Sequence, residues 1–202
     1  MPVKIIHPNH TEIVGLGHVL LTAPHTTSPD ADLHTGQIVE EAALTSRSFA
    51  VIGKADRRFL DPNRFQSAQS EFTKGIAGFV SEDGIRYILD IRGKNESGVE
   101  IGTSEGQTCS VSTTELVRSR LVKDFTVKVN SEHKGDEPGR VVTSYNGKDA
   151  KGNFAVETIQ IQFGQEERQF QREKVIMDIS EMTDILNARL DAHEATNAAA
   201  AP

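Results

Sequence analysis

The feature that most restricts the fold of this chain is an alternation of short apolar runs with amphipathic helical segments. The run 18–23 ends at Pro24 and is typical of a buried strand. Apolar and small residues then recur at helical spacing over 35–47, and a second apolar run follows at 49–52. A strand, a helix and a second strand in this order predict a parallel β-α-β unit with a right-handed crossover.

The same alternation continues along the chain. The segment 67–80 places Phe72, Ile76 and Phe79 on one helical face, and 87–91 is a strong strand. The further expected elements are an irregular lead-in (1–17), a helix with a Ser112–Glu115 capping box, a strand (125–129), a loop or hairpin (130–152), a strand with one wet face (158–163) and a helix capped by Ser180. These elements predict an α/β fold: a single domain over 1–195, with a mixed, largely parallel central sheet flanked by helices, and a flexible Ala-rich tail over 196–202.

Composition excludes several classes of protein. The formal net charge is -7, with 29 acidic and 22 basic residues and no basic stripe, so a nucleic-acid-binding surface is not expected. No apolar run approaches the roughly 20 residues of a membrane span. The single cysteine, Cys109, excludes an internal disulfide and a cysteine zinc knuckle. The first residues carry no secretory apolar stretch, so a cytoplasmic location is the default expectation.

Polar residues gather after the predicted strands. Ligands of open α/β sheets bind beyond the carboxyl ends of the strands. The candidates there are His25, Asp30, Asp32 and His34 after the first strand, Arg57, Arg58, Asp61, Asn63 and Arg64 after the second, and Asp90, Arg92, Glu96 and Glu100 after the strand at 87–91. Each also has a structural interpretation, such as a turn cap for His25 or a charge partner of Asp61 for Arg64. The cluster as a whole predicts a polar pocket at one edge of the sheet.

Short motifs at these strand ends follow one another over residues 18–170. A strand closes on Ala23-Pro24-His25, and Asp61-Pro62-Asn63-Arg64 follows the next strand. Further on come Leu89-Asp-Ile-Arg-Gly93, Val99-Glu-Ile-Gly-Thr103 and Gln160-Ile-Gln162. In this order they resemble the Pro-His turn, the Asp-x-Asn-Arg motif, the Asp-x-His strand end, the Ile-Gly-Thr segment and the Gln-x-Glu strand of the N-formylglutamate amidohydrolases.

That resemblance implies a zinc carboxypeptidase-like fold, of the phosphorylase/hydrolase-like type, and hydrolysis of amide bonds in small acylated or γ-linked amino acids. It implies His25 as a zinc ligand, with Asp32 or a neighbour as an acidic ligand. A hydrolytic zinc takes about three protein ligands and a water whose pKa falls to roughly 7. The residues implied to bind a small carboxylated substrate are Arg58, Asp61, Asn63 and Arg64.

Two catalytic positions depart from the family pattern. Arg92 stands at the place of a histidine ligand, and a guanidinium has no lone pair to donate to zinc. Gln162 stands at the place of a glutamate suited to general-base catalysis, and an amide takes no proton at neutral pH. His34 is the nearest histidine that could complete a metal site with His25. Two interpretations follow: a hydrolase with an altered site, or a catalytically silent relative that binds a carboxylated ligand or a protein partner.

A third interpretation rests on Gly102-Thr-Ser104-Glu-Gly106, which fits the Gly-x-Ser-x-Gly motif of serine hydrolases. Asp124 and His133 follow it in the order of that class. The motif requires a strand directly before the serine and a helix directly after it. Here the preceding strand is short and the next predicted helix begins only near Ser112, which disfavours this interpretation.

Overall fold

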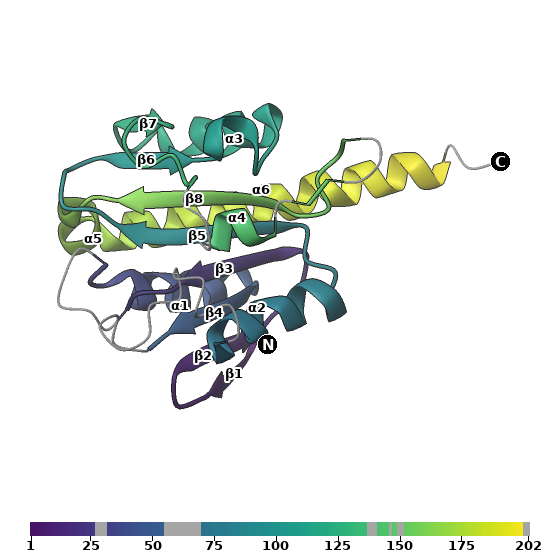
Figure 1. Ribbon diagram of the computed structural model, residues 1–202, viewed down its shortest axis with the longest axis horizontal. Helices are drawn as coiled ribbons and strands as arrows, with labels where there is room; N and C mark the ends of the chain where they lie inside the picture. The colour runs from purple at the N-terminus through teal and green to yellow at the C-terminus, as the bar shows by residue number, and fades with distance from the viewer. Residues whose placement is uncertain (27–31, 55–69, 137–140, 146, 149–151, 200–202) are drawn as a thin grey trace.

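One mixed sheet of eight strands organises the described part of the computed structural model (Figure 1). The structure describes residues 1–26, 32–54, 70–136, 141–145, 147–148 and 152–199. In chain order the strands are β1 (Val3–Ile6), β2 (His10–Val14), β3 (Val19–Ala23), β4 (Phe49–Gly53), β5 (Tyr87–Gly93), β6 (Val99–Gly102), β7 (Val127–Val129) and β8 (Glu157–Phe163). Their order across the sheet is β1-β2-β4-β3-β5-β8-β6-β7.

The centre of the sheet is parallel. Strands β4, β3, β5 and β8 pair in parallel, whereas β2 joins β4 and β6 joins β8 in the antiparallel sense. All five residues of β3 and of β4 are buried, as expected for strands covered on both faces. The helix α1 (Thr35–Ser46) connects β3 to β4. The predicted α/β fold with a mixed, largely parallel sheet and flanking helices is confirmed.

Helices cover both faces of the sheet (Figure 1). The remaining helices are α2 (Glu71–Glu82), η2 (Ser104–Gly106), α3 (Val111–Leu121), α4 (Val141–Ser144), α5 (Gln165–Phe170) and α6 (Arg172–Ala199). Side chains of a strand alternate between faces, and β3 shows this directly. Leu21 packs in the core shared with α1 and α6, while Leu20 packs in the core shared with α2 and α4. In the described residues, no helix combines the length and apolar character needed to cross a bilayer.

The amino-terminal residues depart from the expected irregular lead-in. They form an antiparallel hairpin of β1 and β2, and β2 continues the sheet by pairing with β4. Every residue of β1 is exposed, so burial of an apolar face does not account for this strand. The hairpin depends on backbone pairing, which the sequence pattern does not display.

Strand β8 also differs from the expectation of one wet face. Gln160 and Gln162 are both buried, because they face polar groups of the neighbouring strands and not solvent. A polar residue in an alternating strand therefore marks a polar interior here, and alternation alone cannot distinguish the two cases.

Two predicted helix starts are displaced. The hydroxyl oxygen of Ser110 accepts a hydrogen bond from the Thr113 N–H and caps α3, so Ser112 lies inside the first turn. Ser180 lies in the middle of α6, where its hydroxyl donates to the carbonyl of Ile176, a bond that a serine in a helix interior commonly makes. Helix α6 begins at Arg172 and runs past residue 196, the predicted start of the tail. The expected loop at 130–152 includes the short helix α4.

Candidate functional site

His25 and Asp32 form a buried pair beyond the carboxyl end of β3. Nδ1 of His25 lies 2.8 Å from Oδ2 of Asp32, and only 2% of His25 is exposed. Burial by itself would raise the pKa of Asp32, but the hydrogen bond with His25 and the charge of Arg92 hold that pKa below its usual 3.8. Asp32 is therefore an ionised acceptor and His25 donates its Nδ1 proton. This bond makes Nε2 the ring nitrogen that would act on a substrate.

Asp32 also connects two neighbouring strands. Its second oxygen, Oδ1, accepts a hydrogen bond of 2.8 Å from the backbone N–H of Gly93, the last residue of β5. The carboxyl ends of β3 and β5 therefore meet at one carboxylate. This is the edge at which open α/β sheets bind ligands.

Buried polar side chains line the sheet beside this pair. Arg92 of β5 stands opposite Gln162 of β8, and Gln162 stands opposite Glu100 of β6. Paired residues of adjacent strands share one face of the sheet, so the three form a row. Nε of Arg92 donates to Asp90 over 2.7 Å, and the Thr22 hydroxyl donates to the other oxygen of Asp90 over 2.7 Å. We call Arg92, Gln162 and Glu100 the polar row.

Glu100 anchors one end of the polar row. Its Oε1 accepts hydrogen bonds from three successive backbone N–H groups, those of Ser131, Glu132 and His133, at 3.0, 2.6 and 2.8 Å. Burial opposes ionisation of the carboxyl, but these donors, led by His133, lower the pKa of Glu100. Glu100 is thus a fixed carboxylate that holds the following loop over the sheet.

Three zinc ligands do not come together among the described residues of this edge. Both oxygens of Asp32 already accept hydrogen bonds, and Arg92 is ion-paired with Asp90. His34 has a left-handed backbone (φ 74°) at the start of α1, and its Nδ1 lies 3.4 Å from Oε1 of Gln37. Within the described ranges, no third metal-ligating side chain joins His25 and Asp32. The assignment of His25, Asp32 and His34 to one zinc ion therefore stays a prediction.

Comparison with known proteins identifies the architecture. No protein-family model and no curated protein matches this chain significantly. Solved structures do match it. The N-formylglutamate amidohydrolase from Ralstonia eutropha JMP134 has a TM-score of 0.69 and 14% identity, over 92% of this chain and 99% of that chain. The chain shares its fold.

Two further solved structures agree. A gene product of Agrobacterium tumefaciens has a TM-score of 0.59 and 11% identity, over 88% of this chain and 96% of that one. A bacteriophage poly-gamma-glutamate hydrolase has a TM-score of 0.50 and 8% identity, over 88% and 89% of the two chains. At these identities the likeness establishes the fold, and the chemistry has to be argued from the side chains.

The predicted substrate-binding residues Arg58, Asp61, Asn63 and Arg64 lie outside the described residues. Their role in binding a carboxylated substrate therefore stays a prediction.

The serine hydrolase interpretation finds no support in the geometry. Ser104 follows β6 in a left-handed conformation (φ 49°), but it begins the three-residue helix η2, and α3 starts only at Val111. Asp124 is bound by Arg120 at 2.7 Å and Lys174 at 2.9 Å. Its carboxylate is therefore committed to these cations and is not an orienting partner of His133.

Three residues that the sequence analysis left unassigned also come together. His7, His10 and Glu12 of the β1–β2 hairpin each bring a ligand atom within 4.8 Å of the others. The spacing of His10 and Glu12, two residues apart on a strand, places both on one face. That signal becomes visible only once the segment is known to be a strand.

Proposed function

We propose that this chain hydrolyses amide bonds in small acylated or γ-linked amino acids, with His25 as the general base. The observation that carries the proposal is the buried His25–Asp32 pair beside Arg92, at the ligand-binding edge of the sheet. Two of the proteins that share the fold are named as an amidohydrolase and a poly-gamma-glutamate hydrolase, which supports this class of reaction.

The roles follow from the chemistry of each group. Nε2 of His25 takes a proton from a water molecule, whose oxygen bonds to the amide carbon, while Asp32 keeps the Nδ1 proton in place. The carbon–nitrogen bond then breaks and His25 returns the proton to the leaving amine, so the products are a carboxylic acid and an amine. The guanidinium of Arg92 supplies positive charge for the oxyanion that forms, and the Gln162 amide offers hydrogen bonds that orient the substrate.

The test is an amidase assay on N-formylglutamate, N-acetylglutamate and γ-glutamyl amides. We expect His25→Ala to lower kcat by about 10²–10⁴-fold, the usual contribution of a general base. His18→Ala is the matched control, because His18 lies before β3 and contacts the Gly84 carbonyl instead. Assays with and without a chelator, together with metal analysis, test the zinc expectation. Turnover that His25→Ala leaves unchanged would refute the proposal.

A second candidate is a relative that binds a carboxylated ligand without hydrolysing it. The buried Arg92 beside Gln162 favours it, because a fixed cation next to an amide suits binding without proton transfer. Glutarate and N-acylglutamates would then raise the melting temperature without turnover, and Arg64→Ala would abolish the shift. Hydrolysis of any of the N-acylglutamates would exclude the candidate.

A further inference from the structure

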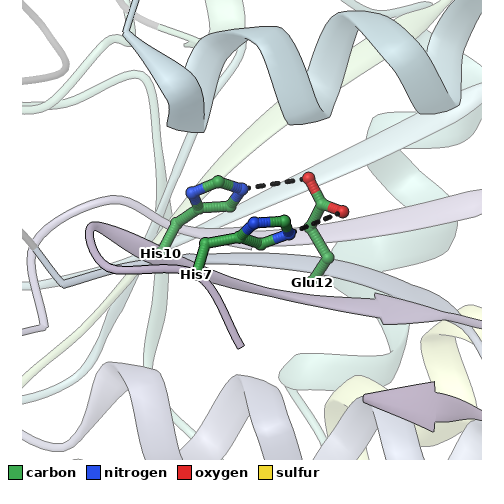
Figure 2. Close-up of side chains that lie close together, drawn as sticks. All are labelled: His7, His10 and Glu12. Atoms are coloured by element: carbon green, nitrogen blue, oxygen red, sulfur yellow. Dashed lines mark hydrogen bonds and ion pairs between the residues drawn. The ribbon is translucent and has the colours of Figure 1, made fainter. Parts of the chain in front are cut away.

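The β1–β2 hairpin carries a cluster of two histidines and one carboxylate, which we call the hairpin cluster: His7, His10 and Glu12. Nε2 of His10 lies 3.0 Å from Oε1 of Glu12, and Nε2 of His7 lies 3.3 Å from Oε2. The two imidazole rings are stacked, with centroids 4.3 Å apart and planes 6° from parallel. Figure 2 shows the rings one above the other, with the Glu12 carboxylate at the same end of both.

The hairpin holds these side chains in place. The backbone N–H of His7 donates to the carbonyl of His10 over 2.9 Å and closes the turn. His10 and Glu12 lie on β2, which pairs with β4 through His10 opposite Gly53. The sheet therefore fixes two of the three side chains, and the turn fixes the third.

The hydrogen bonds of the hairpin cluster are incomplete. His10 is only 3% exposed, yet its Nδ1 has no hydrogen-bond partner among the described residues, and neither has Nε2 of His7. Nε2 of His7 points toward Glu12 without the geometry of a hydrogen bond. Burying ring nitrogens without partners costs free energy. A metal ion beside the Glu12 carboxylate would give Nε2 of His7 a partner, whereas Nδ1 of His10 points away from the carboxylate that its Nε2 contacts.

A cavity of about 290 Å³ opens beside the cluster, between the hairpin and α2. Besides the cluster it is lined by Glu71, Glu82 and Asp83, with Lys74 as the one basic residue, so the lining favours a cation. Lys74 is itself paired with Glu71 at 2.6 Å. Gly75 of α2 lets the helix approach, because a Cβ there would lie 2.6 Å from Oε1 of Glu12 and 3.5 Å from Nε2 of His10.

We propose that the hairpin cluster binds one divalent transition-metal ion of the zinc type, with His7, His10 and Glu12 as its ligands. Zinc bonds nitrogen and oxygen at about 2.0–2.2 Å, so two ligands of one tetrahedral ion lie about 3.3 Å apart. The separations from the carboxylate to the two rings match this. Imidazole ligands favour zinc, copper, nickel or iron over magnesium and calcium. Three protein ligands would leave a fourth position for water or a further ligand.

This site is separate from the proposed active site, and its metal would not depend on hydrolysis. The hairpin cluster stands on β2, whereas His25 follows β3, and β4 lies between these strands. The two proposals can therefore fail independently.

The decisive experiment is zinc titration of the full-length, metal-free protein by calorimetry, with cobalt substitution as a spectroscopic readout of the ligands. We expect one zinc per chain, bound at least 10-fold more weakly in His7→Ala and Glu12→Gln. His7→Ala is the safer variant for folding because the His7 side chain is 38% exposed. His18→Ala and His25→Ala are the matched controls, and both should bind zinc as the wild type does.

Absence of zinc binding by the wild type would overturn the proposal. Wild-type affinity in His7→Ala would overturn it as well, and a concurrent loss in His25→Ala would move the metal to the β3 edge. Circular dichroism of each variant separates loss of the site from loss of the fold.

Discussion

At the residue scale, the partners of Asp32 determine how His25 can react. One carboxylate oxygen fixes the imidazole and the other is held by the N–H of Gly93, so neither the ring nor the acid can turn freely. In Asp32→Asn the amide can present an N–H to the ring and favour the wrong tautomer. We expect kcat to fall by about 10²–10⁴-fold. The free energy of unfolding should fall by about 1–3 kcal/mol, measured by urea denaturation.

Asp191→Asn is the control for that substitution, because Asp191 lies exposed on α6. Equal activity in Asp32→Asn and the wild type would show that the pair is structural and has no part in the reaction.

The fixed carboxylate of Glu100 predicts a dependence of stability on pH. Its pKa in the folded protein lies below the 4.5 of an unperturbed glutamate, because three backbone N–H groups stabilise the ionised form against the cost of burial. The unfolded chain thus takes up this proton at a higher pH than the folded protein does. The stabilisation is complete above about pH 5.5 and is lost as the pH falls through 4.5 and then through the folded-state pKa.

Glu100→Gln removes the ionisable group, so its free energy of unfolding should change less between pH 6 and pH 3 than that of the wild type. At pH 7 we expect a loss of about 1–3 kcal/mol. Urea denaturation at several pH values measures both effects, with Glu115→Gln on the exposed side of α3 as the control. Parallel pH curves for Glu100→Gln and the wild type would contradict the prediction.

The sequence could indicate His25 but not its partner's full role. A proline and a histidine directly after an apolar run form a local pattern, and a local pattern can be recognised from the sequence alone. The bond from Gly93 to Asp32 joins residues 61 positions apart, and the row of Arg92, Gln162 and Glu100 depends on the register of three strands. Strand order and register follow from tertiary packing, which residue spacing along the chain does not display.

At the element scale, prediction succeeded where an element buries apolar side chains, on one face of a helix or on both faces of a central strand. The segments β3, α1, β4, α2 and β5 all present apolar periodicity, and the structure contains each of them. The hairpin β1–β2 was missed because β1 buries no side chain, and with it the hairpin cluster was missed too. The start of α6 was misplaced because Ser180 resembles a cap in sequence while bonding inside the helix.

Helices α3 and α6 are joined by one arginine. Arg120 donates to Asp178 over 2.5 Å and to Glu181 over 2.5 Å on α6, and to Asp124 over 2.7 Å just after α3. Asp178 is fully buried, so removal of Arg120 would leave its charge without compensation. We expect Arg120→Met to lower the free energy of unfolding by about 3–5 kcal/mol, measured by thermal and urea denaturation.

The double variant Arg120→Met with Asp178→Leu should recover most of that loss, because both charges are then removed together. Arg118→Met is the matched control, since Arg118 pairs only with the exposed Glu115 in the described contacts. A double variant as unstable as Arg120→Met alone would show that packing of the arginine stem, and not its charge, joins the two helices.

At the scale of the whole molecule, two polar centres lie on opposite sides of one strand. On one side β4 pairs with β3, which the His25–Asp32 pair follows. On the other side it pairs with β2, which bears His10 and Glu12 of the hairpin cluster. Gly53 stands at the end of β4, opposite His10, and a Cβ there would lie 2.4 Å from the Pro24 carbonyl oxygen. The backbone after β3 therefore passes directly against β4. A metal bound to the hairpin would stabilise the edge of the sheet that ends in the exposed strand β1.

Hydrogen exchange can test this arrangement without any assay of activity. When the free zinc concentration is about 100 times the dissociation constant, binding suppresses opening of the bound region by about 100-fold. We therefore expect slower exchange in peptides covering residues 3–14 and 71–82, which contain the hairpin and α2. Peptides from β6, β7 and α3 should exchange at the same rate with and without zinc, because they lie at the far edge of the sheet. In His7→Ala the effect of zinc on the hairpin should disappear. Slowing confined to the peptides around His25 and β5 would place the ion at the β3 edge and contradict the prediction.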